Sequence, residues 1–259
     1  MTTHKPAAAA MPGADYFDQW YADMADSTSR DAIVARMLGL PAHLRSTSLL
    51  TWQGIAELTD RLQVPRDGLL LDIACGRGGY GIEIAHRTGA RLIGVDFSAT
   101  ALRQAESAAA ERLPAGQAEF RVGTLLETGL PGGAADALMC VDAVQFAEPP
   151  LAALHEFRRL LKPGGRLALT CWEAVDPDDP LVPPRIRAVD LLRDLTAAGF
   201  ADVEVRDRPD WRQAERTLWE TVAAQPEPDA AMRSLQEEGS RALETFGSLR
   251  RMSATATAP

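Results

Sequence analysis

A short apolar run that leads directly into a glycine-rich turn constrains this chain more than any other feature. Residues 69–73 read Leu-Leu-Leu-Asp-Ile, and residues 74–81 contain four glycines. An unbroken apolar run is typical of a buried parallel strand, and the glycines allow a tight turn and the close approach of a ligand. Free amides at the start of the next helix attract negative charge. The pattern therefore predicts a strand, turn and helix that hold a small, partly anionic cofactor.

A second apolar run, residues 91–96, ends on the carboxylate of Asp96, 20 residues after Gly76. An acid at the tip of the second strand of such a unit is placed to accept hydrogen bonds from ribose hydroxyls. The two runs together predict a cofactor that carries a ribose.

Gly76, Gly78 and Gly81 also fit the G-x-G-x-x-G pattern of dinucleotide sites, which alone is a weak signal. Asp72 discriminates between cofactors, because a carboxylate four residues before Gly76 would repel a pyrophosphate held by the same turn. It suits a cofactor that carries an ammonium and a sulfonium. A nicotinamide-dependent oxidoreductase is an alternative that rests on the glycine pattern alone, and the chain has no Tyr-x-x-x-Lys motif to support it.

Three segments resemble, in order, the signatures of class I S-adenosylmethionine-dependent methyltransferases of the small-molecule, natural-product type. The run Asp72-Ile-Ala-Cys-Gly-Arg-Gly is similar to the first signature, and Val95-Asp96-Phe97-Ser98 is similar to the second. Residues 155–167 resemble the family's helix, turn and fifth strand. The resemblance implies S-adenosylmethionine as cofactor and methyl transfer to a small acceptor in secondary metabolism, with oxygen, nitrogen or carbon as the accepting atom.

Strand and helix patterns alternate from residue 69 onward, which predicts an α/β fold with a mostly parallel, doubly wound, Rossmann-like sheet. The resemblance implies seven strands, with the last two adjacent and antiparallel at one edge. The expected strands are Leu69–Ile73, Arg91–Val95, Glu119–Val122, Ala137–Val141, Arg166–Thr170, Asp202–Arg206 and Arg250–Ala258. The expected helices are Arg30–Leu38, Ser48–Leu62, Gly79–Arg87, Ala99–Glu111, Pro150–Leu161, Asp190–Ala198, Trp211–Ala224 and Pro228–Thr245, and residues 176–184 are expected to form a loop.

The predicted organisation is a disordered tail over residues 1–13 and one methyltransferase domain over residues 14–259. Within the domain we expect an N-terminal helical lid at 14–64, the core at 65–206, a helical cap insertion at 207–249 and the last strand at 250–259. The length of 259 residues suits one such domain with a small cap.

Aromatic residues at helical spacing mark the first helix, and they include Phe17, Trp20 and Tyr21. One interpretation is that this face simply packs on the main domain. The other is that it forms a lid over the site, and the resemblance implies a position for Tyr21 near the methionine end of the cofactor.

The resemblance extends to individual cofactor-binding positions at the carboxyl ends of the strands, where ligands bind in such sheets. It implies that backbone near Ala74 and Gly76 holds the methionine portion, Asp96 the ribose and Phe97 the adenine face. Many relatives carry an aspartate for the adenine amine where this chain has Gly123-Thr124, so the Thr124 hydroxyl or nearby backbone must serve instead. The full predicted set is Tyr21, Asp72, Ala74, Gly76, Asp96, Phe97, Thr124, Leu125, Leu126, Val141 and Asp142.

The predicted catalytic residues are Gln145 and His43. Several small-molecule methyltransferases carry a histidine base where this chain has Gln145, and a glutamine orients a nucleophile but cannot remove its proton. His43, in the helical region near the chain's start, is the candidate base. Other titratable residues considered as bases are His155, Glu173 and Asp142, with surface packing favoured for His155.

Aromatic residues available to line an acceptor pocket predict a partly apolar, aromatic or polycyclic substrate. They are Phe17, Trp20, Phe146, Trp172 and Trp211, with Trp219 two helical turns after Trp211. The alternative for Trp211 and Trp219 is that they only pack their helix against the rest of the fold.

The net charge and the cysteine content limit the partners and the cellular location that we expect. A net charge of −9 repels phosphate backbones and anionic lipid surfaces, so neither nucleic acid nor a membrane is an expected partner. Three cysteines without a secretory leader predict free thiols and a cytoplasmic protein, and no His/Cys cluster predicts a metal. A homo-oligomer is left open.

A further alternative keeps the fold and drops the methyl transfer. The missing histidine base is compatible with a cyclase or isomerase that retains the cofactor for structure or charge.

Overall fold

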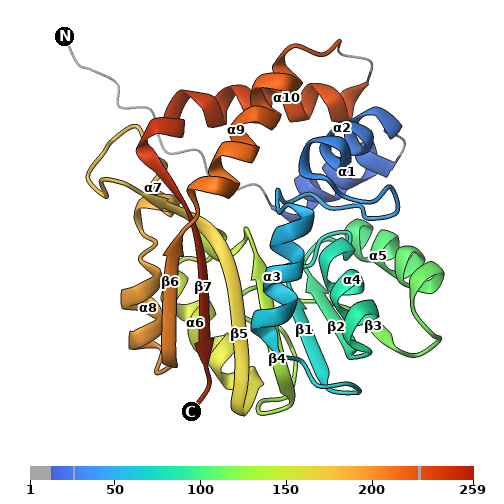
Figure 1. Ribbon diagram of the computed structural model, residues 1–259, viewed down its shortest axis with the longest axis vertical. Coiled ribbons are helices and arrows are strands. Elements are labelled where there is room, and N and C mark those ends of the chain that lie inside the picture. Colours follow the sequence, from blue (N-terminus) through green and yellow to red (C-terminus); the bar gives the residue numbers. More distant parts are fainter. Residues whose placement is uncertain (1–12, 26, 227–228) are drawn as a thin grey trace.

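The computed structural model describes residues 13–25, 27–226 and 229–259. The expected disordered tail lies outside these residues except for Gly13, as does Pro228, the expected first residue of a helix. A seven-stranded sheet forms the centre of the molecule in the order β3-β2-β1-β4-β5-β7-β6 (Figure 1). The strands are β1 (Leu69–Ile73), β2 (Arg91–Asp96), β3 (Ala118–Val122), β4 (Ala135–Val141), β5 (Leu161–Ala174), β6 (Ala201–Asp207) and β7 (Leu249–Thr257).

Helices cover both faces of the sheet, as the alternating pattern predicts. On one face lie α3 (Trp52–Leu62), α4 (Gly79–Thr88) and α5 (Ala99–Arg112), and on the other lie α6 (Pro150–Leu160) and α8 (Leu191–Ala197). Strand β1 shows why its sequence is continuously apolar. Leu70 belongs to the first hydrophobic core, whereas Leu69 and Leu71 belong to the second, so both faces of the strand are buried.

The last two strands are adjacent and antiparallel, which confirms the expected edge. β7 pairs with β5 in nine consecutive residue pairs and with β6 on its other side. This pairing extends β5 to Ala174, beyond the expected end at Thr170, so Trp172 is a strand residue opposite Arg251.

Two further differences from the expected elements concern helices. Helix α3 begins at Trp52 rather than Ser48, because the Thr51 side chain accepts a hydrogen bond from the Gly54 amide at 3.1 Å and caps the helix there. The expected loop at 176–184 leads into α7 (Pro184–Arg187), a one-turn helix that the sequence analysis did not include.

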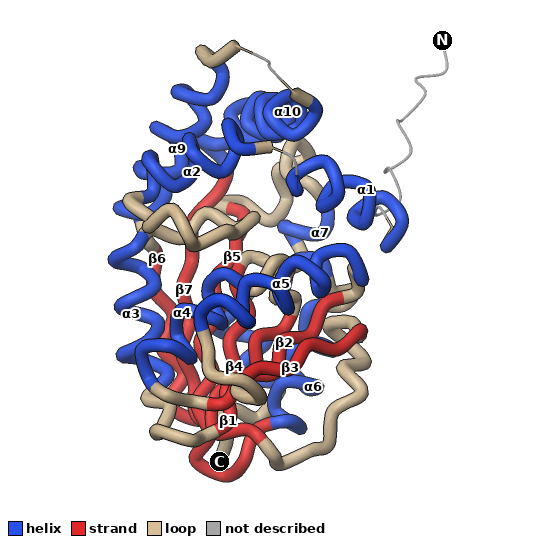
Figure 2. The backbone as a smooth tube through the Cα atoms, turned by 90° about the vertical axis from the view of Figure 1, so that its right-hand side faces the viewer, coloured by secondary structure: helices blue, strands red, loops and turns tan. Residues whose placement is uncertain are grey.

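A layer of helices lies across the carboxyl ends of the parallel strands (Figures 1 and 2). It combines α1 (Ala14–Ala25) and α2 (Thr28–Leu38), from the start of the chain, with α9 (Pro209–Ala223) and α10 (Ala230–Thr245), from the insertion before β7. Segments about 200 residues apart in sequence pack together in this layer. Helix α10 contacts α1 and α2, and α9 contacts α2. The short 3₁₀ helices η1 (Val144–Phe146) and η2 (Phe246–Ser248) complete the described elements.

None of the helices in the described part of the chain has the length and apolar character needed to cross a bilayer.

Candidate functional site

The glycine turn between β1 and α4 is built from backbone conformations that side chains disfavour. Ala74, Gly76 and Gly78 have φ angles of 60°, 52° and 74°. A Cβ placed on Gly76 would lie 2.7 Å from the Tyr21 hydroxyl of the lid and 3.3 Å from Thr47 Oγ1. The turn therefore needs glycine at position 76 for two reasons, its φ angle and the close approach of the lid.

Asp96, at the end of β2, holds this turn in place. One carboxylate oxygen accepts the Gly76 amide at 2.8 Å and the other accepts the Ser98 amide at 2.9 Å. The side chain is 3% exposed. Burial raises the pKa of the Asp96 carboxyl and these amide hydrogen bonds oppose that rise. The carboxylate can accept further hydrogen bonds, since each oxygen has more than one acceptor position.

Asp72 brings a second buried carboxylate to the same turn. A Cβ on Gly81 would lie 2.5 Å from Asp72 Oδ2, so the third glycine of the dinucleotide-like pattern makes room for an acid. Burial, reinforced by the charge of Asp96, raises the pKa of Asp72 to about 7, against a hydrogen bond from the Gly81 amide. Two neighbouring carboxylates disfavour a pyrophosphate and favour a cationic ligand.

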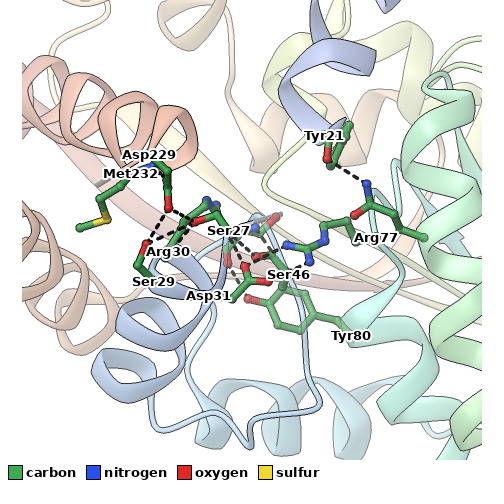
Figure 3. A network of polar contacts seen from close by, with 12 residues as sticks. Tyr21, Ser27, Ser29, Arg30, Asp31, Ser46, Arg77, Tyr80, Asp229 and Met232 are labelled. Atoms are coloured by element: carbon green, nitrogen blue, oxygen red, sulfur yellow. Dashed lines mark hydrogen bonds and ion pairs between the residues drawn. The ribbon is translucent and has the colours of Figure 1, made fainter. Parts of the chain in front are cut away.

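An ion-pair network ties the turn to the lid and the cap (Figure 3). Arg77, within the turn, donates to both carboxylate oxygens of Asp31 on α2, at 2.9 and 2.8 Å. Arg30 donates to the same Asp31 at 3.1 Å. Ser27 and Ser29 donate to Asp229, the N-cap of α10, at 3.0 and 2.9 Å. Bidentate pairs of this kind fix geometry, so the lid is held in one orientation over the turn.

The aromatic face of α1 lies over the tips of β1 and β2. Tyr21 is 5% exposed, and burial raises the pKa of its hydroxyl. Phe17 packs edge-on against Phe97 with a centroid distance of 5.1 Å, and Trp20 donates through its indole nitrogen to Ser234 of α10 at 3.0 Å. Of the two interpretations of this helix, the contact with both the turn and the cap matches a lid.

In the segment after β3, the hydroxyl predicted to contact adenine makes hydrogen bonds within its own turn. The Thr124 hydroxyl accepts the amides of Leu126 and Glu127, at 3.3 and 3.0 Å, and so stabilises its own turn. Thr124 and Leu126 are exposed and Leu125 is partly buried.

Gln145 lies on η1 directly after β4. Its Nε2 donates to the Asp142 carbonyl at 2.7 Å. Its Oε1 is buried and has no hydrogen-bond partner among the described residues. A buried acceptor without a donor is unfavourable, so this oxygen is suited to a ligand group that donates a hydrogen bond. The neighbouring Phe146 is 39% exposed.

The carboxylate of Asp142 is bound by strands β5 and β7 and by the segment before α3, rather than left free at the rim. It accepts hydrogen bonds from the Thr170 hydroxyl at 2.6 Å, from Arg251 at 2.7 Å and from the Leu49 amide at 3.3 Å. Any contribution to a cofactor site by Asp142 and the buried Val141 would therefore come from backbone.

Sequence reasoning missed the buried ion cluster around Arg251. Arg251 is 0% exposed, its guanidinium lies 5.2 Å from the Trp172 ring, and its Nε is 3.8 Å from Glu215 Oε2. Burial and the charge of Asp142 raise the pKa of Glu215 to about 8, against the opposing effect of Arg251. The available signal was an arginine pair, residues 250–251, at the start of a strand that is otherwise small and apolar.

Two predicted site residues lie apart from the others. His43 Nε2 is 3.4 Å from Glu83 Oε2 on α4, and its side chain is 41% exposed. Trp211 is buried against α3, where a Cβ on Gly54 would approach its ring to 3.2 Å, and Arg208 stacks over it at 3.6 Å. Trp211 therefore seats α9, which matches the packing alternative.

Comparison with known proteins adds three observations. A family profile described as a methyltransferase domain matches residues 70–165. The O-methyltransferase resE of Aspergillus sclerotiorum is 23% identical over 178 residues, covering 64% of this chain and 67% of that protein. For seven other curated relatives, the matched region covers from 30% to 58% of the relative's length.

Solved structures share the fold. Phosphoethanolamine N-methyltransferase 2 of Haemonchus contortus, in complex with S-adenosyl-L-methionine, matches with a TM-score of 0.76 and 18% identity over 97% of this chain and 61% of that one. The [4+2]-cyclase SpnF matches with a TM-score of 0.68 and 21% identity over 98% and 99%. The same fold thus supports both methyl transfer and cyclisation in other proteins, and the fold alone does not choose between them.

Proposed function

The chain belongs to the class I S-adenosylmethionine-dependent methyltransferases, and from this membership we propose that it transfers a methyl group from S-adenosylmethionine to a small, partly apolar acceptor. The observation that carries the proposal is the pair of buried carboxylates, Asp72 and Asp96, that face one glycine turn. When bound, the cofactor supplies an electrophilic methyl group on a sulfonium. Two acids fit that cation and its ammonium better than they fit a dinucleotide.

We assign the cofactor's methionine portion to Asp72 and to the backbone of Ala74 and Gly76, closed by Tyr21. Asp96 would hold the ribose, supported by its free acceptor capacity, and Phe97 the adenine face, supported by its contact with Phe17. The remaining wall of the proposed site is formed by Thr124, Leu125, Leu126, Val141 and Asp142.

On the acceptor side, the chain's residues position rather than deprotonate. We propose that Gln145 orients the acceptor through Oε1, supported by that atom's lack of a partner among the described residues. Holding two reactants in line can contribute about 7–11 kcal/mol to lowering a barrier, so an acceptor in a reactive protonation state would need no base. His43 is the second candidate, and its use as a base would require release from Glu83.

Phe17, Trp20, Phe146 and Trp172 are the proposed apolar walls of the acceptor site, whereas Trp211 packs against α3 and would only seat α9. The lid and the cap would exclude water from the acceptor site. The proposal includes a cytoplasmic setting and small-molecule partners, supported by the acidic charge and by three free cysteines. It leaves the oligomeric state open.

Incubation with S-adenosylmethionine labelled on its methyl group tests the proposal against its closest rival. Methyl transfer predicts label in the product and a mass increase of one methylene. A cyclase or isomerase on this fold predicts a product of unchanged mass and no transferred label, with the cofactor still bound. Absence of cofactor binding in calorimetry would refute both.

A further inference from the structure

Arg185, on α7, is a cation whose nitrogens lack partners. Its guanidinium carbon lies 4.5 Å from the centre of the Phe146 ring. Phe146 directly follows Gln145 in the sequence. Among the described residues it makes no hydrogen bond and has no carboxylate within 4 Å. The stacking on Phe146 holds the guanidinium plane while leaving its N–H groups free. Burial lowers the pKa of Arg185, so water does not fully solvate the charge.

Glu238, on α10, is the acid whose charge acts on Arg185. It is an exposed residue, and no ion pair within 4 Å joins these two described side chains. The helix α7, which carries Arg185, contacts β5 and η1. Arg185 therefore lies beside the element that carries Gln145.

The acids near Arg185 do not neutralise it. Asp31 is already bound by Arg30 and Arg77. Among the described residues, Glu238 is the acid whose charge acts on Arg185, and Arg30 and Arg241 act on the same Glu238. The positive charge of Arg185 is therefore left for a ligand to neutralise.

We propose that Arg185 binds an anionic oxygen group of the acceptor, a carboxylate or a phosphate. This rests on the proposed function, because it assigns the acceptor side of the same site. The planar guanidinium matches the geometry of both groups with two parallel hydrogen bonds. Arg185, the proposed anchor, stacks on Phe146, the residue after Gln145, so it would fix which end of the acceptor reaches the Gln145 amide.

Calorimetry on the full chain saturated with S-adenosylhomocysteine tests the anchor without requiring turnover. The probes are benzoate and its neutral counterpart benzamide, followed by phenyl phosphate and inorganic phosphate. Wild-type protein should bind benzoate or phenyl phosphate at least about tenfold more tightly than benzamide. Arg185→Gln should remove that preference and Arg185→Lys should restore part of it.

Two further variants separate the anchor from a general charge effect. Arg36→Gln removes an exposed arginine on α2 and should leave the preference unchanged. Glu238→Gln should strengthen binding of the anionic probes, because it removes the opposing charge. Equal affinity of wild type for benzoate and benzamide, together with no preference for phenyl phosphate, would overturn the anchor, as would an Arg185→Gln variant with wild-type preference.

The same titrations distinguish this failure from failure of the proposed function. If S-adenosylhomocysteine binds but the anionic preference is absent, the anchor is wrong and the methyltransferase proposal stands. If S-adenosylhomocysteine does not bind, the proposed function itself is wrong. A preference for inorganic phosphate equal to that for phenyl phosphate would identify the phosphate group alone as the ligand of Arg185.

Discussion

The glycine turn and the helical layer above it are two halves of one site with different origins in the sequence. In the turn, Asp96 binds a backbone amide 20 residues away and Asp72 lies against Gly81, nine residues on. In the helical layer, Trp20 binds Ser234 from 214 residues away and Ser27 binds Asp229 from 202 residues away. The turn is local and therefore visible as a motif, whereas the layer depends on contacts that only the folded chain creates.

The difference also extends to charge. The turn gathers acids, Asp72 and Asp96, and suits a cation. The four helices of the layer carry ten acids and six arginines, so the positive charge proposed to hold the acceptor comes from Arg185 on α7. Cofactor and acceptor would thus be distinguished by individual side chains of opposite charge, not by the net charge of the two regions.

The largest expected effect is on the turn. Gly76→Val places a β-branched side chain at a φ of 52° and against the Tyr21 hydroxyl, so cofactor binding should fall below detection in calorimetry. Gly133→Val is the matched control, because Gly133 also has a positive φ, 65°, but nothing within 4 Å of its added Cβ. Normal cofactor affinity in a folded Gly76→Val protein would refute the assignment of the turn.

The buried ion cluster around Arg251 should respond in stability instead. Arg251→Met leaves Asp142 and Glu215 buried without their cation and should lower the free energy of unfolding by about 3–5 kcal/mol in urea denaturation. Its neighbour provides the control. Arg250→Met removes a side chain that is 44% exposed and pairs with Glu173, and should cost under about 1 kcal/mol. Equal losses for the two variants would show that the Arg251 cluster is not a structural centre.

Asp96→Asn tests the second acid with little change in shape. The loss of charge-assisted hydrogen bonds to the Gly76 amide and to a ribose should weaken cofactor binding by about 1.5–3 kcal/mol. Unchanged affinity in a titration would remove the ribose assignment.

Gln145→Ala should give the smallest effect. A lost hydrogen bond to the acceptor of about 0.5–1.5 kcal/mol predicts a turnover number lower by roughly three- to tenfold, with cofactor affinity unchanged. Gln145→His should raise the rate, with a pH dependence near the histidine pKa of about 6.5, only if deprotonation of a hydroxyl limits the reaction. If Gln145→Ala keeps the wild-type rate at every pH, Gln145 has only a structural role and His43 is the next residue to test.

Sequence patterns predicted the parallel sheet and the glycine turn, because apolar periodicity and glycine conformation are local properties, whereas the antiparallel edge came from the family resemblance. They placed Asp142 at the correct edge but could not predict the direction of its carboxylate, which Arg251 on β7 determines. They named Thr124 as an adenine contact without revealing that its hydroxyl caps its own turn. Arg185 escaped notice because it is an ordinary charged residue until α7 places it over the Phe146 ring.

The pH dependence of cofactor affinity tests the central claim, that a buried acid pair at the glycine turn selects a sulfonium cofactor. Asp72 has a pKa raised to about 7, so it becomes charged, and attracts the cofactor more strongly, as the pH rises through that value. Between pH 6 and 8, S-adenosylmethionine should gain affinity for wild type relative to Asp72→Asn, and a nicotinamide dinucleotide should bind neither. Parallel pH profiles for the two proteins, or tighter binding of the dinucleotide, would contradict the account.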